Sequence, residues 1–192
     1  MSDKIFSYLF SKRTLVLAGK ITEESVTKLI EKVFELQIES AKEPVTLLIN
    51  SGGGNIIVSF KLCDMLDYVF TVPVHGVVIG DCSSSATLIL LSCKKKLCLP
   101  HSEFLIHSNS IADVRSSTES DMLDLANDLK STREKMIEFY MKKLDCSYED
   151  IQNFIKRGDK KFNRHLSAEE AKSIGLIDEI ITENINIFSS SV

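Results

Sequence analysis

Several function classes leave recognisable features in a sequence, and this 192-residue chain lacks most of them. It contains no apolar run near the roughly 20 residues that a bilayer-spanning helix needs. Its formal net charge of −4 provides no basic excess, so we expect neither nucleic acid nor an anionic membrane as a partner. The N-terminal segment 1–13 has a short apolar patch but no small-residue cleavage site of the kind that follows a secretion signal.

Paired cysteines, metal-ligand clusters and nucleotide-binding motifs are also missing. The five cysteines form no C-x-x-C pair and mostly lie in apolar runs, which favours free thiols in a reducing cytoplasm. The four histidines are far apart in the sequence, so we predict no metal site. Only eight glycines are present, and the consecutive Gly52–Gly54 match neither phosphate-binding nor dinucleotide-binding spacing. We therefore expect the chain to bind no cofactor and no ATP of its own.

What remains is the composition of one globular domain. The apolar fraction of 44% and the charged fraction of 26% are ordinary values, and a chain of this length can bury a real core. The sequence contains neither an internal repeat nor a linker, so we expect a single domain over residues 1–192 with a polar tail at 182–192.

Short apolar strands alternate with amphipathic helices, which predicts an α/β fold of βαβ units. The longest helix, expected within 117–144, would be close to 40 Å long at 1.5 Å per residue. Because a small domain cannot cover such a helix, we expect it to project and to pack against another subunit. We expect another helix to begin at Thr22 and further helices to span 56–70, 86–93, 148–157 and 167–175. We expect strands at 14–17, 45–49, 74–79, 97–99, 103–106 and 176–181.

The stretch 74–100 contains the most interesting candidate for chemistry. A strand that we expect to break at Gly80 leads into three serines, Ser83–Ser85, and then into a helix. The simple interpretation is that a serine caps the helix. Alternatively, a serine at such a junction places a hydroxyl beside unpaired backbone N–H groups, as a nucleophile and its oxyanion hole require. His107, at the end of a strand, is likewise either a structural residue or a general base.

Four segments, in the right order and at nearly the right separations, resemble the ClpP family of Clp protease proteolytic subunits. They are INSGGG (49–54) for the family's INSPGG, GDCSSSAT (80–87) for G-x-A-[AS]-S-M-G-A, CLPHSEFLIHS (98–108) for CLPNSxxMIHQ, and HLSAEEAKSIGLIDEI (165–180) for FLSAEEAxEYGLID. The resemblance implies a ClpP/crotonase-like spiral of βαβ units. It also implies that Ser84 is the nucleophile, that His107 is its base, and that the backbone N–H groups of Gly54 and Ser85 bind the oxyanion.

The same resemblance implies the assembly and the substrates. The chain would be a serine endopeptidase that cleaves unfolded polypeptides and peptides inside a chamber. Heptameric rings of this chain or of a paralogue would pair through the long helix into a tetradecamer, and a hexameric Clp-type ATPase would feed it and consume the ATP. The family docks its ATPase through surface aromatics, whereas this chain has Thr46 and Leu48 before the INS segment and retains Tyr68, so docking is expected to be altered or weak.

Two departures from the family concern activity and ring pairing. The third triad member is an aspartate in the family, but the matching position here holds Asn163, and Asp159 in a slightly longer loop is the alternative. An amide oxygen can orient a histidine but cannot stabilise its imidazolium by charge. After His107 the family has a glycine- and glutamine-rich strand that pairs two rings, and the segment SNSIADVRSS lacks both residue types.

These departures leave two alternatives to an active peptidase. The chain could be a weakly active or inactive regulatory ring subunit that pairs with a competent paralogue. It could also belong to the crotonase class, which shares the spiral fold and binds acyl-CoA thioesters, although a serine nucleophile is not expected there. The presence of both Ser84 and His107 favours the peptidase.

Overall fold

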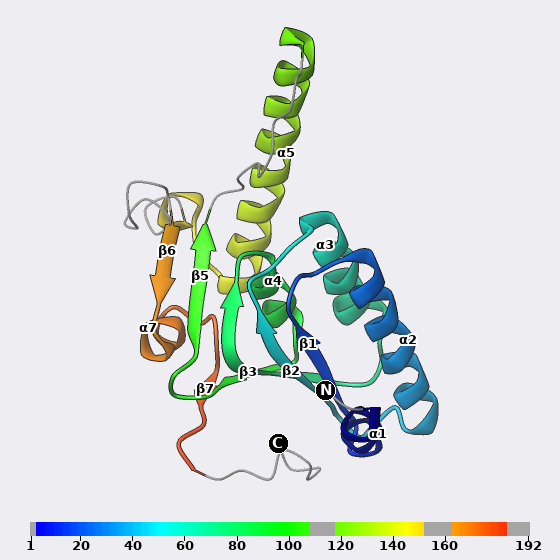
Figure 1. The fold of residues 1–192 in the computed structure, drawn as a ribbon. Coiled ribbons are helices and arrows are strands. Elements are labelled where there is room, and N and C mark those ends of the chain that lie inside the picture. The colour runs from blue at the N-terminus through cyan, green and yellow to red at the C-terminus, as the bar shows by residue number, and fades with distance from the viewer. Residues whose placement is uncertain (1–2, 108–117, 152–162, 184–192) are drawn as a thin grey trace. The chain divides into compact units, whose positions relative to one another are not determined.

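The computed structural model describes residues 3–107, 118–151 and 163–183 (Figure 1). The chain divides into two compact units, one made of Met1–Leu105 with His165–Val192 and the other of Ile106–Arg164.

The first unit is built on a parallel sheet whose strands are mostly buried apolar runs. Four strands lie in the order in which they occur along the chain, and a short fifth strand closes that row: β1 (Thr14–Ala18), β2 (Val45–Ser51), β3 (Val74–Ser83), β4 (Lys95–Cys98) and β7 (Glu179–Ile180). Two further strands leave this row, because β5 (Glu103–His107) pairs with β3, and β6 (Asn163–Leu166) pairs with β5. The register of the parallel pairs confirms the predicted α/β class.

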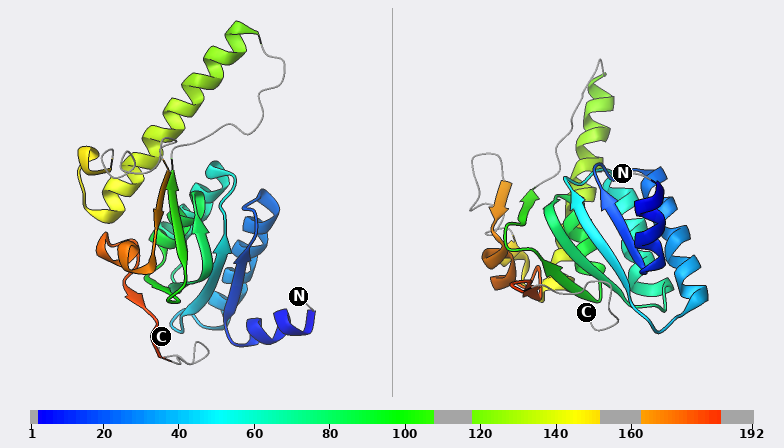
Figure 2. Two further views of the ribbon diagram at one scale, coloured as in Figure 1. Left: turned by 60° about the vertical axis from the view of Figure 1, so that its left-hand side comes forward. Right: turned by 60° about the horizontal axis from the view of Figure 1, so that its bottom comes forward.

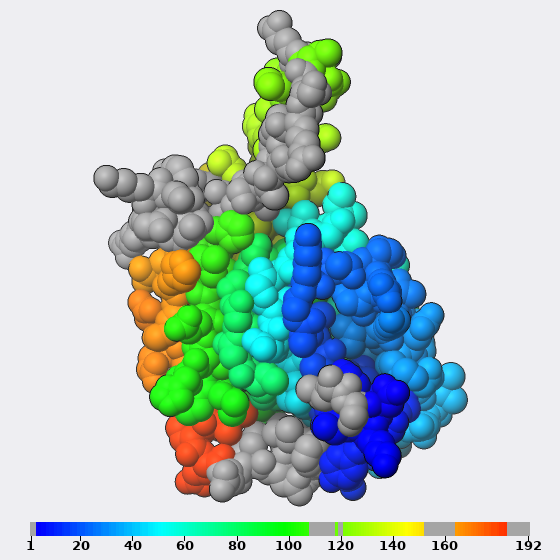
Figure 3. All heavy atoms as spheres, viewed as in Figure 1, coloured from blue at the N-terminus to red at the C-terminus, as the bar shows by residue number. Residues whose placement is uncertain are grey.

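Helices connect the parallel strands of this unit, as βαβ crossovers require. The connecting helices are α2 (Glu23–Glu39), α3 (Ile56–Asp64) with a short π-helical continuation at Met65–Val69, and α4 (Ser85–Ser92). They lie on one face of the sheet (Figures 1 and 2), and all eight residues of α4 are buried. Figure 3 shows the heavy atoms in the view of Figure 1. Most side chains of β2 and many of those of β3 are buried, whereas Asn50 of β2 and Ile79 of β3 are exposed.

The two outer helices of this unit are shorter. Helix α1 (Asp3–Ser11) precedes β1, and α7 (Ala168–Ser173) follows β6. Ser167 caps α7 through a reciprocal capping box with Glu170, as the sequence predicts. Helix α1 was not predicted: none of its residues is fully buried, and nine residues are too few for a clear helical stripe of apolar side chains.

Two predicted strands differ from the observed ones by more than two residues at one end. The strand expected at 74–79 continues through Gly80 to Ser83. Gly80 marks a change of partner, since β3 pairs with β4 at residues 75–78 and with β5 at residues 81–83. A side chain at Gly80 would collide with the Asn50 side chain, whose Oδ1 lies 2.8 Å from the position of a Cβ there. The strand expected at 176–181 is reduced to β7, Glu179–Ile180.

The second unit contains the long helix α5 (Glu119–Leu144), whose bounds confirm the predicted helix to within two residues. Thr118 forms a capping box with Asp121, and Asp145 ends the helix in the left-handed conformation at φ 49°. Met136, Ile137 and Tyr140 are buried, whereas Met122 and Leu123 near the start are more than half exposed. Of the next predicted helix, residues 148–151 are helical, and the rest of it lies outside the described residues.

None of the helices among the described residues combines the length and the apolar character that crossing a membrane would require.

Candidate active site

Ser84 lies at the junction of β3 and α4 in a backbone conformation that few side chains adopt. Its φ is +57° and its ψ is −130°, outside the main regions allowed to non-glycine residues. Its N–H donates to the carbonyl oxygen of Leu105 on β5 over 2.7 Å, and its own carbonyl oxygen accepts from the N–H and the hydroxyl of Thr87. These bonds to β5 and to α4 hold the strained residue in place.

The capping interpretation of Ser84 is therefore only half right. Ser84 occupies the N-cap position of α4, but its side chain makes no capping hydrogen bond. The N–H of Thr87, which a capping hydroxyl would accept from, is already bonded to the Ser84 carbonyl oxygen over 3.0 Å. An N-cap residue normally has an extended backbone, and the positive φ of Ser84 turns its side chain away from that role. A serine with this backbone between a strand and a helix is a candidate nucleophile.

The flanking serines have different partners. The Ser83 hydroxyl donates to the Asp81 carboxylate, and the Asp81 N–H donates to Asn50 Oδ1 over 3.0 Å. The Ser85 side chain accepts a hydrogen bond from the N–H of Gly54 over 3.0 Å. None of these three bonds was predicted. Two of them, between Asp81 and Asn50 and between Gly54 and Ser85, join residues 31 positions apart and depend on how the segments that carry β2 and β3 pair.

The glycine turn after β2 lies directly against this serine turn. Gly53 has a φ of +89°, and a Cβ there would lie 2.7 Å from the Ser83 carbonyl oxygen and 2.8 Å from Ser84 Cβ. A Cβ at Gly52 would meet only Asp81 Oδ2, at an ordinary 3.4 Å. Position 53 therefore requires a glycine, because the glycine turn and the serine turn approach each other too closely for a side chain there.

The turn's amides are bonded to side chains. The Gly53 N–H donates to Ser51 Oγ over 3.1 Å, and the Ser51 hydroxyl donates to the Gly19 carbonyl oxygen over 2.6 Å. Asn55 then caps α3 by accepting from the N–H groups of Ile57 and Val58. This network fixes the turn between β1, β2 and α3.

His107 and Asn163 lie at strand ends. His107 is the last residue of β5 and is partly buried, and Asn163 is the first residue of β6. Both belong to the second unit, whereas Ser84, Ser85 and Gly54 belong to the first. Asp159, the alternative third member, lies outside the described residues.

The buried thiols of the first unit are poor nucleophiles. Burial raises the pKa of the Cys82 thiol well above its ordinary value, with the Asp81 carboxylate adding to the effect. Burial likewise raises the pKa of Cys98 to about 11. Both thiols are neutral at pH 7, and the thiolate is the reactive form, so Ser84 has no thiol competitor in β3 or β4. Among the described residues, no group of three or more His, Cys, Asp or Glu side chains could hold a metal ion.

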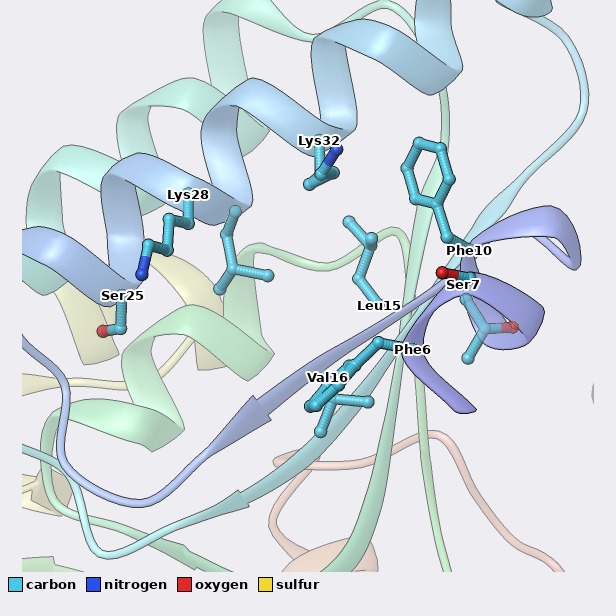
Figure 4. A pocket seen from close by; sticks show the side chains of 10 residues that line it. Phe6, Ser7, Phe10, Leu15, Val16, Ser25, Lys28 and Lys32 are labelled. Carbon is cyan, nitrogen blue, oxygen red and sulfur yellow. The ribbon is translucent and has the colours of Figure 1, made fainter. Parts of the chain in front are cut away.

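Two cavities in the first unit lie away from the serine turn. One, of about 440 Å³, is lined by Phe6 and Phe10 of α1, by β1, and by Lys28 and Lys32 of α2 (Figure 4). The other, of about 410 Å³, is lined by residues 100–104 and by residues 165–168 and 170. Neither lining includes a candidate catalytic residue.

The positions compared with the family's docking aromatics differ in exposure. Thr46 and Leu48 are buried at 6% and 8% exposure, whereas Tyr68 is 70% exposed. Tyr68 is therefore the one of the three whose side chain is largely at the surface of the described chain.

Comparison with known proteins identifies relatives along almost the whole chain. Residues 1–184 match the family model described as Clp protease. The chain is 27% identical over 180 residues to the ATP-dependent Clp protease proteolytic subunit of Leuconostoc citreum, covering 93% of this chain and 87% of that protein. It is also 27% identical over 183 residues to the ATP-dependent Clp protease proteolytic subunit 1 of Chlamydia muridarum, covering 94% of this chain and 92% of that protein.

Proposed function

The chain belongs to the Clp protease family, and from this membership we propose that it is a serine endopeptidase whose nucleophile is Ser84. The observation that carries the proposal is the backbone of Ser84, at φ +57° and ψ −130° between a strand and a helix. A strained conformation costs about 1–3 kcal/mol and persists where function requires it. The match to this family also favours a peptidase over the crotonase class.

The proposed reaction is acyl transfer through an acyl-enzyme. His107 accepts the proton of the Ser84 hydroxyl while Ser84 Oγ bonds to the peptide carbonyl carbon. The tetrahedral oxyanion accepts hydrogen bonds from the N–H groups of Gly54 and Ser85. The imidazolium then donates its proton to the leaving amine, and water, deprotonated by His107, hydrolyses the ester and regenerates Ser84.

We propose that Asn163 is the third member of the site. Its carboxamide oxygen would accept the Nδ1–H of His107 and so select the tautomer in which Nε2 faces Ser84. An amide supplies no negative charge to stabilise the imidazolium, so the step that forms this cation is expected to be slower than with an aspartate. Asp159 remains the alternative partner.

The assembly and partners are proposed from the family. One peptidase domain over residues 1–192 would form heptameric rings with itself or with a paralogue. Helix α5 would project and pair two rings into a tetradecamer, since its first turns expose Met122 and Leu123. A hexameric Clp-type ATPase would deliver unfolded polypeptides and use the ATP, and the cytoplasm is the proposed location.

Two features of the sequence favour a second candidate function. Asn163 replaces the family's aspartate, and the segment after His107 lacks the family's glycines and glutamines. Both changes would suit a weakly active or inactive ring subunit that regulates a competent paralogue. This candidate predicts that Ser84 stays unreactive even in the assembled particle.

The deciding experiment compares hydrolysis of a short fluorogenic peptide by the assembled wild-type protein, Ser84→Ala and Ser83→Ala. The proposal predicts that Ser84→Ala abolishes hydrolysis. Ser83→Ala is the matched control, because the family motif has alanine or serine at that position, and it is expected to retain activity. Equal activity of wild type and Ser84→Ala would refute the proposal, and an inactive wild type would favour the regulatory subunit.

A further inference from the structure

The amide of Gly54 is already bonded to a side chain of the nucleophile turn. Its N–H donates to Ser85 Oγ over 3.0 Å, although the two residues are 31 positions apart. Ser85 is only 3% exposed, so little water reaches this bond. In the resting chain, one proposed oxyanion donor is therefore occupied by the residue that provides the other.

This contact depends on a serine at position 85. The family motif has methionine at this position, whose thioether is only a weak acceptor. A serine hydroxyl accepts an amide hydrogen bond readily, and the structure places its oxygen at an ordinary hydrogen-bond distance from the Gly54 nitrogen.

We infer that Ser85 is a positioning residue whose hydroxyl competes with the substrate oxyanion for the N–H of Gly54 and thereby slows turnover. The inference rests on the proposed function, in which this N–H stabilises the oxyanion. To reach it, the oxyanion must replace Ser85 Oγ or share the hydrogen with it. The net value of one such hydrogen bond corresponds to a penalty of about 2- to 10-fold in rate.

The surrounding contacts explain why removal of the hydroxyl should help rather than harm. The glycine turn keeps its bonds from Gly53 N–H to Ser51 Oγ and from Ser51 Oγ to the Gly19 oxygen. Asn55 still caps α3. The turn thus remains in place without Ser85 Oγ, and the backbone N–H of Ser85 is unchanged.

The test measures kcat and KM for a fluorogenic peptide with Ser85→Ala, Ser85→Thr and Ser92→Ala in the assembled protein. Ser85→Ala is expected to raise kcat about 2- to 10-fold with KM unchanged, and to tighten binding of a peptide boronate by a similar factor. Ser85→Thr keeps a hydroxyl and should not show this increase in kcat. Ser92→Ala removes a buried hydroxyl from the other end of α4, where it donates to Asp67 over 3.2 Å, and should leave kcat unchanged.

Hydrogen–deuterium exchange of overlapping peptides that isolate the Gly54 amide provides a readout independent of catalysis. Exchange should be faster in Ser85→Ala than in wild type and Ser85→Thr, and unchanged exchange would refute the contact. Faster exchange with an equal or lower kcat would refute the competition. The rate at which a fluorophosphonate labels Ser84 separates the two proposals. Equal labelling rates in wild type and Ser85→Ala would overturn this inference alone. Absence of labelling in both proteins would overturn the proposed function as well.

Discussion

Two regions of the molecule supply the proposed catalytic residues, and they differ in what holds them. In the first unit, Ser84 is bonded to β5 and α4, and a Cβ at Gly53 would lie only 2.8 Å from Ser84 Cβ. In the second unit, His107 ends one strand and Asn163 begins another, and each borders a segment that departs from the family in sequence or length. The turn that carries the proposed nucleophile thus follows from the register of the sheet, whereas the proposed base lies next to a segment that does not match the family motifs.

The largest expected effect on kcat comes from replacing His107. His107→Ala should lower kcat about 10⁶-fold, because nothing then accepts the Ser84 proton. The measurement is hydrolysis of a fluorogenic peptide by the assembled protein. His101→Ala, a histidine that lines the 410 Å³ cavity instead, is the control and should keep wild-type activity. Retained activity of His107→Ala would assign the base elsewhere.

A substitution in the glycine turn should displace the serine turn that carries Ser84. Gly53→Ala places a Cβ 2.8 Å from Ser84 Cβ at a φ of +89°, so the serine turn must move. We expect a loss of about 10²-fold in kcat, the cost of an ångström-scale misplacement, and about 1–3 kcal/mol of stability. Thermal unfolding and peptide hydrolysis measure both effects. Gly52→Ala, with only an ordinary contact to Asp81, should change neither, and equal effects of the two variants would contradict the packing described.

Asn163→Asp introduces the aspartate that the resemblance to the family implies for the third member of the site. A carboxylate would stabilise the imidazolium of His107, so kcat should not fall. If formation of the imidazolium limits the reaction, kcat should rise about tenfold, which corresponds to about 1.4 kcal/mol of transition-state stabilisation. If another step limits it, kcat should be unchanged. Asn163→Ala is the paired variant and should lower kcat by removing the acceptor. If Asn163→Asp abolished hydrolysis, Asn163 would not be the third member.

The smallest effect concerns the sheet rather than either catalytic region. The Asp178 carboxylate accepts the Lys96 N–H over 2.7 Å and pairs with Lys96 Nζ at 2.8 Å, next to β7. Asp178→Ala should lower the free energy of unfolding by about 1 kcal/mol, as loss of one such hydrogen bond does, with kcat unchanged. Denaturant unfolding measures this. A change in kcat without a loss of stability would show that the edge of the sheet influences the site.

The element order could be predicted because it depends on local patterns. Buried runs such as Val45–Ile49 and the long polar helix with acids at its start are visible in the sequence, and the structure confirms both. Helix α1 was not predicted, because none of its residues is completely buried and its sequence therefore has no clear apolar stripe. The end of β3 was misjudged because Gly80 and Asp81 are poor strand residues, and pairing with β5 overrides their preference.

The candidate site could be predicted only as a set of residues. Its geometry depends on contacts between distant segments: Ser84 with Leu105, Gly53 with Ser83, and Gly54 with Ser85. No local pattern encodes a positive φ at a serine, so the sequence also could not exclude a side-chain cap at Ser84. The hydroxyl of Ser85 was overlooked because the sequence assigned it only a backbone role.

The most direct measurement of the central claim is mass-spectrometric mapping of the residue modified by a fluorophosphonate in the intact assembled protein. Only an activated hydroxyl beside an oxyanion hole reacts rapidly with such a probe. We predict a single adduct, on Ser84, that is lost in His107→Ala and retained in Ser83→Ala. An adduct on another residue, or none in the assembled protein, would contradict the account.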